Sequence, residues 1–218
     1  MDPVAAAREL AARPGIAILG VAGQPGAGKS TLAERIVAEV SDAVLVGMDG
    51  FHLAHDTLIQ LGRVERKGAP DTFDAYGYVA LLRRIRGLDS LDYPGRNRLG
   101  RLDHPGPGEV VWAPEFDRDL EDAIAGAVAV TADVPLVVTE GNYLLLDEPP
   151  WGEVLGLLDA CWYVDIDEDV RRARLQARHE SHGCTPEEAR ERTWGSDERN
   201  AVLVSASRSR ASAIITSS

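Results

Sequence analysis

Residues 23–30 read GQPGAGKS, and the fold assignment depends on this segment. It matches the pattern G-x-x-x-x-G-K-[ST] in full, and IAILGVA at 16–22, a buried-strand pattern, precedes it. From Lys29 to Val40 apolar residues recur at helical spacing, so a helix follows the motif. Glycines in such a loop let backbone N–H groups curl around phosphate oxygens, and the helix adds the positive end of its dipole. The sequence therefore predicts a phosphate-binding loop for a nucleoside triphosphate.

Two positions of this loop have specific expected roles. The Lys29 ammonium would reach the β- and γ-phosphates, and the Ser30 hydroxyl would ligate magnesium. A guanine-specific Asn-Lys-x-Asp element is absent, because the only other lysine of the sequence is Lys67. The sequence therefore disfavours a GTPase.

Further apolar runs predict a sheet around the loop. Strands are expected at 43–48, 134–139, 160–166 and 211–216, with helices at 76–87, 150–158, 168–181 and 186–194. Strands that are apolar on both faces and alternate with helices indicate an α/β fold, a doubly wound parallel sheet of about five strands flanked by helices. Residues 88–118, with four prolines and four glycines, are expected to be an irregular loop apart from a short strand at 109–112. We expect residues 1–218 to form a single domain.

Composition narrows the function. The chain has 218 residues, with 35 acidic and 23 basic side chains and a net charge of -12. This charge disfavours a nucleic-acid partner, which needs basic surface to neutralise phosphates. No apolar run is long enough for a membrane span, and the N-terminal segment has Asp2 and Glu9 where a signal peptide has a basic start and an apolar core. We expect a cytoplasmic protein without a nucleic-acid or membrane partner, with a homodimer as the candidate assembly.

Two carboxylates follow predicted strands. Asp49 comes directly after strand 43–48, and Glu140 ends strand 134–139. The carboxyl ends of parallel strands meet at one edge of a sheet, so both acids should lie beside the phosphates. There Asp49 could accept a proton from an attacking hydroxyl, and Glu140 could lie on the metal side. The alternatives are an Asp-Gly turn for Asp49 and a solvated strand-end acid for Glu140.

In this order, GQPGAGKS, MDGFHL, RKGAPDTFD and VVTEGNYLLL resemble the uridine kinase, phosphoribulokinase and pantothenate kinase group of P-loop kinases, over nearly the whole chain. The resemblance implies a P-loop NTPase fold with a helical lid, and transfer of the γ-phosphate of ATP to a small molecule's hydroxyl with ATP and Mg²⁺ as cofactors. It implies that Asp49 is the catalytic carboxylate and that Ser30 and Glu140 hold the metal. The residues expected to bind ATP in the loop are Gly23, Gln24, Pro25, Gly26, Ala27, Gly28, Lys29, Ser30 and Thr31.

The lid is expected at 168–195. Arg171, Arg174 and Arg178 fall on one face of its first helix. The resemblance implies that Arg174 and Arg178 close over the ATP phosphates, and Arg174 joins Asp49 and Lys29 as a catalytic residue; Arg171 is the weaker candidate. The alternative is a solvated basic face balanced by neighbouring acids.

The acceptor is less constrained. RKGAPDTFD at 66–74 resembles the pantothenate kinase version of this segment more than the uridine kinase version, in which an aspartate stands at the position of Gly68. Where pantothenate kinases have a histidine after a tyrosine, however, VWAP at 111–114 has Trp112 and Pro114. The chain thus resembles an uncharacterised nucleoside-or-sugar kinase branch of the group. The alternatives are a pantothenate or sugar-phosphate kinase and, in another class, an ATP-binding regulator without an acceptor.

Residues near strand ends or in motif loops are candidates for binding the hydroxyl acceptor. They are His52, Lys67, Asp74 and Tyr143, with Phe51, Phe73 and Trp112 as flat walls. For each, local packing or a surface position is the alternative. Arg96, Arg98 and Arg101 would bind the phosphate of a phosphorylated acceptor, or else form a solubilising surface loop.

Overall fold

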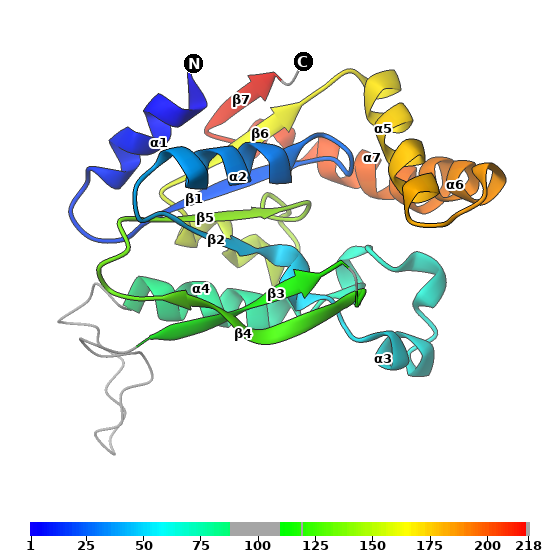
Figure 1. Cartoon of the computed structure of the whole chain (residues 1–218), viewed down its shortest axis with the longest axis horizontal. Coiled ribbons are helices and arrows are strands. Elements are labelled where there is room, and N and C mark those ends of the chain that lie inside the picture. Colours follow the sequence, from blue (N-terminus) through cyan, green and yellow to red (C-terminus); the bar gives the residue numbers. More distant parts are fainter. Residues whose placement is uncertain (88–109, 119, 217–218) are drawn as a thin grey trace.

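The computed structural model of the chain describes residues 1–87, 110–118 and 120–216. Its centre is a five-stranded sheet in the order β2-β5-β1-β6-β7, and every neighbouring pair is parallel (Figure 1). The strands are β1 (Ala17–Gly23), β2 (Val44–Gly47), β5 (Leu136–Gly141), β6 (Ala160–Asp165) and β7 (Ala213–Thr216). The predicted parallel sheet is confirmed, and its central strands β1 and β5 are buried along their whole length.

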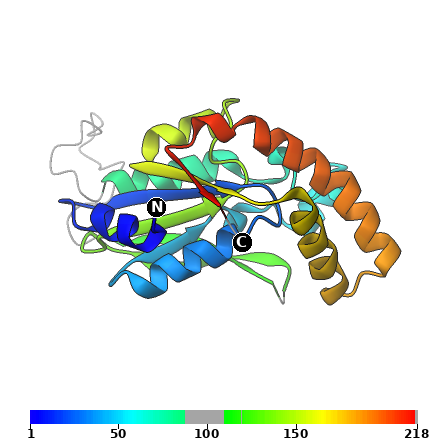
Figure 2. The same ribbon diagram turned by 90° about the horizontal axis from the view of Figure 1, so that it is seen from above.

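Helices cover both faces of the sheet. Helices α1 (Pro3–Ala11) and α2 (Lys29–Glu39) pack on one face, where Leu19 and Ile36 belong to one apolar cluster. Helix α4 (Ala75–Gly87) packs on the other face, where Ile18 and Leu82 belong to a second cluster (Figures 1 and 2). The short α3 (His55–Gln60) precedes α4. The sequence reading did not identify α1, although Asp2 caps it by accepting a hydrogen bond from the Val4 N–H at 3.0 Å.

A helical arm follows β6. It consists of α5 (Glu168–Ser181), α6 (Pro186–Arg192), a π-helical turn over Thr193–Asp197, and α7 (Glu198–Ala206). Helices α5 and α6 lie beyond one end of the sheet, and α7 runs back toward it (Figures 1 and 2). The predicted helices are confirmed, including the capping box of Thr185 and Glu188, but α7 was missed.

The short strand expected at 109–112, in a segment 88–118 predicted to be otherwise irregular, overlaps a longer strand, so the irregular loop was wrong for residues 113–117. Strand β3 (Val111–Asp117) pairs with β4 (Asp122–Val130) in an antiparallel hairpin, which packs against Met48–Phe51 and β2. Strand β4, DAIAGAVAV, is rich in alanine and mostly exposed, so neither strand propensity nor alternation marks it in the sequence. Residues 88–109, with Arg96, Arg98 and Arg101, lie outside the described residues.

The helix predicted over 150–158 was also wrong. Two short 3₁₀ helices occupy this segment, Trp151–Glu153 and Leu155–Leu157. Gly152 and Gly156 lower its helix propensity. No helix within the described ranges is long and apolar enough to cross a membrane.

Candidate active site

The loop over 23–30 connects β1 to α2 and opens into a cavity of 830 Å³. Gly26, Gly28, Lys29, Ser30 and Thr31 line this cavity. A Cβ atom added at Gly26 would lie 2.7 Å from Leu175 Cγ of α5, and the φ of Gly26 is +81°. Only glycine fits there, because the loop packs closely on α5 in a left-handed conformation. The predicted loop is therefore wrapped around a space that can hold phosphates.

Lys29 is the cation of this loop. Its side chain is buried, and Nζ donates a hydrogen bond to the Gln24 carbonyl at 3.0 Å. Burial lowers the pKa of Lys29, while the nearby carboxylates of Glu140 and Asp49 act in the opposite direction. The ammonium and both predicted carboxylates thus lie within electrostatic reach of one another.

Ser30 and Glu140 form the candidate metal site. Glu140 is placed by the sheet, since it pairs in register with Gly47 of β2 and with Val21 of β1. Ser30 Oγ donates to Glu140 Oε1 at 3.1 Å. Burial, together with the Asp49 carboxylate, raises the pKa of Glu140 to about 7. A cation beside Glu140 would offset this cost of burying charge.

This donor set fits magnesium. A hydroxyl and a carboxylate are hard oxygen ligands, and Mg²⁺ usually takes one or two protein ligands plus water and substrate phosphates. Within the described part of the chain, no cluster of three or more His, Cys, Asp or Glu residues could hold a metal ion by itself. The two side chains can therefore supply only part of a coordination shell, as a nucleotide-borne magnesium ion requires.

Asp49 lies close to Lys29 of this cavity and to His52, a predicted acceptor residue. It follows β2 in the 3₁₀ helix Met48–Phe51, with its side chain 35% exposed. The hairpin packs on its neighbour, since a Cβ atom added at Gly50 would lie 2.6 Å from the Pro114 carbonyl oxygen. His52 Nδ1 contacts the Asp49 carbonyl oxygen at 3.0 Å and lies 4.0 Å from Asp49 Oδ1. Asp49 is therefore near both Lys29 of the phosphate-binding loop and His52.

Two predicted acceptor residues, His52 and Lys67, meet the hairpin. The centroid of the His52 ring lies 4.0 Å from that of Phe73 and 5.1 Å from that of Phe116. Lys67 Nζ forms an ion pair with Glu121 Oε2 at 3.1 Å and lies 5.6 Å from the Phe116 ring centroid. Burial lowers the pKa of His52, which favours the neutral ring. Phe116 and Glu121 were not identified from the sequence, because the hairpin that carries them was not.

The other two acceptor candidates make contacts within the protein. The Tyr143 hydroxyl donates to the Gly68 carbonyl, and Tyr143 is fully buried. Asp74 Oδ1 accepts from the Gly77 N–H at 2.8 Å at the start of α4. Their contact with an acceptor stays a prediction. Trp112 is 55% exposed on the hairpin, whereas Phe73 belongs to the core.

The lid arginines separate into two groups. Arg174 and Arg178 line the cavity of the phosphate-binding loop. Arg171 is fully buried and pairs with Glu168 at 2.7 Å and with Glu198 of α7 at 2.6 Å. The three arginines therefore do not share one role. Their spacing suggested a common role, but Arg171 is part of the packing between α5 and α7. Arg118, at the end of β3, also lines the cavity and was missed.

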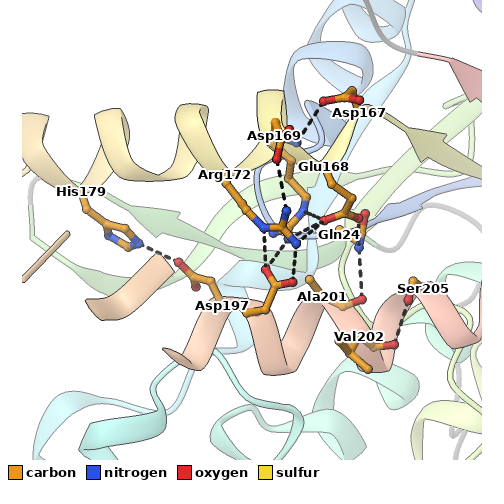
Figure 3. Close-up of polar contacts among 12 residues, drawn as sticks. Gln24, Asp167, Glu168, Asp169, Arg172, His179, Asp197, Ala201, Val202 and Ser205 are labelled. Atoms are coloured by element: carbon orange, nitrogen blue, oxygen red, sulfur yellow. Dashed lines mark hydrogen bonds and ion pairs between the residues drawn. The ribbon is translucent and has the colours of Figure 1, made fainter. Parts of the chain in front are cut away.

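Polar contacts connect the loop to the helical arm (Figure 3). Gln24 Nε2 donates to Glu168 Oε1 at 2.8 Å and to the Ala201 carbonyl at 3.3 Å. Arg172 Nη2 pairs with Glu198 Oε1 at 2.7 Å. The phosphate-binding loop, α5 and α7 are thus joined at one junction.

No family model matches the chain. A protein of Schizosaccharomyces pombe named putative uridine kinase C227.14 is 32% identical over 201 residues, which cover 86% of this chain and 77% of that protein. The ATP-dependent kinase-like protein notR' of Aspergillus versicolor is 33% identical over 146 residues, 65% of this chain and 76% of that protein. The crystal structure of a putative fructose transport system kinase from Silicibacter sp. TM1040 superposes with a TM-score of 0.80 at 32% identity and covers 99% of both chains.

Proposed function

The chain belongs to the family of uridine kinase-like, ATP-dependent P-loop kinases, and we propose that it transfers the γ-phosphate of MgATP to a hydroxyl of a small metabolite. The proposed acceptor is uncharged and polyhydroxylated, either a sugar or the ribose of a nucleoside. The observation that carries the proposal is the position of Asp49. Its carboxylate acts electrostatically on Lys29 and Glu140 at the nucleotide cavity, and it lies 4.0 Å from His52 on the acceptor side. A catalytic base for phosphoryl transfer has to lie close to both the γ-phosphate and the acceptor hydroxyl.

Positive side chains of the cavity would stabilise the negative charge of the reacting phosphates. Lys29, Arg174 and Arg178 would neutralise the charge that spreads over the transferring and leaving phosphates. Ser30 and Glu140 would hold the magnesium ion, which would offset part of the negative charge of the phosphates. Arg118 would reach the same phosphates from the hairpin.

Asp49 would orient the acceptor hydroxyl and take its proton. As the acceptor oxygen bonds to the γ-phosphorus, the bond between that phosphorus and the β,γ-bridging oxygen breaks, and ADP leaves with the bond electrons. The proton passes from the hydroxyl to an Asp49 oxygen and then to solvent. His52 stabilises this arrangement through its contact with the Asp49 carbonyl at 3.0 Å.

The charges on the acceptor side support an uncharged acceptor. Lys67 is paired with Glu121, and Arg63 and Arg66 are both paired with Asp71. An ammonium–carboxylate pair can exchange hydrogen bonds with neutral hydroxyls, whereas an acceptor phosphate would be repelled by Glu121. Two relatives at 32% identity are named a putative uridine kinase and a putative fructose transport system kinase. Uridine and fructose are both uncharged and rich in hydroxyls.

The test is ADP release with MgATP over a panel of uridine, cytidine, D-ribose, D-fructose, fructose 6-phosphate and pantothenate. The Asp49→Asn variant keeps the side-chain shape and removes the base. We expect its kcat to fall by about 10²–10⁴-fold, with the KM for ATP changed less than about threefold. Asp56→Asn, an exposed acid on α3, is the control and should match wild type.

Three outcomes would contradict the proposal. Undiminished turnover in Asp49→Asn would remove Asp49 from the mechanism. Preference for fructose 6-phosphate or pantothenate would replace the acceptor class. Slow hydrolysis that no acceptor accelerates, and that does not depend on Asp49, would favour an ATP-binding regulator.

A further inference from the structure

Helix α7 contacts both sides of the candidate active site. The Ala201 carbonyl accepts a hydrogen bond from Gln24 of the phosphate-binding loop at 3.3 Å (Figure 3). The preceding residue, Asn200, donates through Nδ2 to the Gly68 carbonyl at 3.2 Å. Gly68 lies in the acceptor-side segment 66–74. Consecutive residues of one helix are therefore bonded to the nucleotide side and to the acceptor side.

Gly68 is held by three contacts. Its N–H donates to Thr72 Oγ1 at 3.0 Å, and its carbonyl accepts from the Tyr143 hydroxyl as well as from Asn200. Asn200 is 7% exposed and Tyr143 is fully buried, so these donors have little access to water. Without Asn200 the Gly68 carbonyl would still accept from Tyr143, so the loss removes one of the two donors that fix the direction of this carbonyl.

Helix α7 is itself well fixed. Glu198 pairs with Arg171 at 2.6 Å and with Arg172 at 2.7 Å, both from α5. Together with the contact between Gln24 and Ala201, these pairs hold α7 without any contribution from Asn200. Loss of the Asn200 side chain should therefore loosen the Gly68 peptide and leave the nucleotide cavity in place.

We infer that Asn200 is a positioning residue for the acceptor, acting through the Gly68 carbonyl on Lys67. Lys67 precedes Gly68, and its ammonium reaches Glu121 of the hairpin at 3.1 Å. A shift of the Gly68 peptide would move this ammonium away from Glu121 and the Phe116 ring. The proposed function puts the acceptor next to these two side chains. The inference rests on the proposed function, and it assigns to Asn200 an effect on acceptor binding that is separate from ATP binding.

The experiment compares Asn200→Ala and Asn200→Asp with wild type. The aspartate keeps the side-chain shape but has no N–H to donate, so it tests the bond if the alanine variant folds poorly. The acceptor probe is uridine or D-fructose, whichever wild type phosphorylates faster. We expect both variants to raise the acceptor KM about tenfold and to change kcat and the KM for ATP by less than about twofold. The control is Val202→Ala on the same helix, 63% exposed, which should match wild type.

An acceptor KM within twofold of wild type in both Asn200 variants would overturn the inference, and so would an equal rise in the KM for ATP. If wild type phosphorylates neither probe, the proposed function fails, and amide hydrogen exchange then tests the anchoring separately. Asn200→Ala should speed exchange in a peptide covering 66–74 about tenfold and leave a peptide covering 23–30 unchanged. Unchanged exchange over 66–74 would overturn the inference without reference to activity.

Discussion

At the scale of single residues, the arginines of α5 illustrate what spacing can and cannot predict. Arg171, Arg174 and Arg178 share one helix face in the sequence, yet Arg171 is fully buried while the other two line the cavity. The difference comes from Glu198, which reaches Arg171 from another helix. A contact between residues 27 positions apart leaves no local pattern, so the sequence could suggest the group but could not divide it.

The role of Arg178 in ATP binding can be tested separately from its effect on protein stability. The positive charge of Arg178 acts to lower the pKa of Lys29, so Arg178 does not stabilise the Lys29 ammonium in the unliganded cavity. We expect Arg178→Ala to raise the KM for ATP about tenfold, because a phosphate contact is lost, and to leave the melting temperature unchanged or slightly higher. Steady-state kinetics and thermal unfolding measure the two effects. Arg190→Ala, at an exposed site on α6, is the control, and a KM for ATP equal to wild type in Arg178→Ala would contradict a phosphate-binding role.

At the scale of elements, the sequence predicts those whose ends and periodicity are local. Helix α6 has its capping box, and α2 follows the glycine loop directly. Helix α7 begins without a side-chain cap, directly after a π-helical turn that contains Gly195, so nothing in the sequence marks its start. The hairpin and α7 are the two missed elements that bring Phe116, Glu121 and Asn200 to the site. The acceptor side was therefore less predictable than the nucleotide side.

The contact between α5 and α7 predicts how stability depends on pH. The hydrogen bonds from Arg172 and Arg171 lower the pKa of Glu198 to about 2. Because the pKa is lower in the folded state, the ionised carboxylate stabilises the protein above its unfolded pKa of about 4.5, and this stabilisation is lost as the pH falls toward 2. Partial exposure limits the effect to about 1–2 kcal/mol.

Chemical unfolding between pH 7 and pH 3 tests this prediction with Glu198→Gln. We expect the variant to be less stable at pH 7 and the difference from wild type to shrink as the pH drops below about 4.5. Glu187→Gln, at an exposed position of α6, is the matched control. A difference that stays constant over this range would show that the Glu198 charge does not contribute to folding.

At the scale of the whole molecule, the chain concentrates positive charge where its net charge of -12 would not suggest it. Lys29, Arg118, Arg174 and Arg178 line one cavity, and they come from the phosphate-binding loop, the hairpin and α5. The sheet brings Glu140 beside Ser30 at the same place. A cavity lined by these cations is complementary to the negative charge of a polyphosphate, and the acid beside a hydroxyl is where we propose that its metal ion binds.

This complementarity predicts that a non-hydrolysable ATP analogue stabilises the fold and that magnesium increases the effect. A ligand at about 100 times its Kd adds about 2.7 kcal/mol, which corresponds to about 5–10 °C in a protein of this size. We expect the melting temperature to rise by this amount with the analogue and Mg²⁺, to rise less with the analogue and EDTA, and to stay almost unchanged in Lys29→Met.

Glu140→Gln tests the metal side of the same site. In this variant the melting temperature with the analogue should differ less between Mg²⁺ and EDTA than in wild type, because one metal ligand is lost while the phosphate contacts persist. Thermal unfolding needs no acceptor, so it tests the nucleotide side alone. An equal shift in Lys29→Met and wild type would place the nucleotide elsewhere, and an unchanged magnesium dependence in Glu140→Gln would remove Glu140 from the metal site.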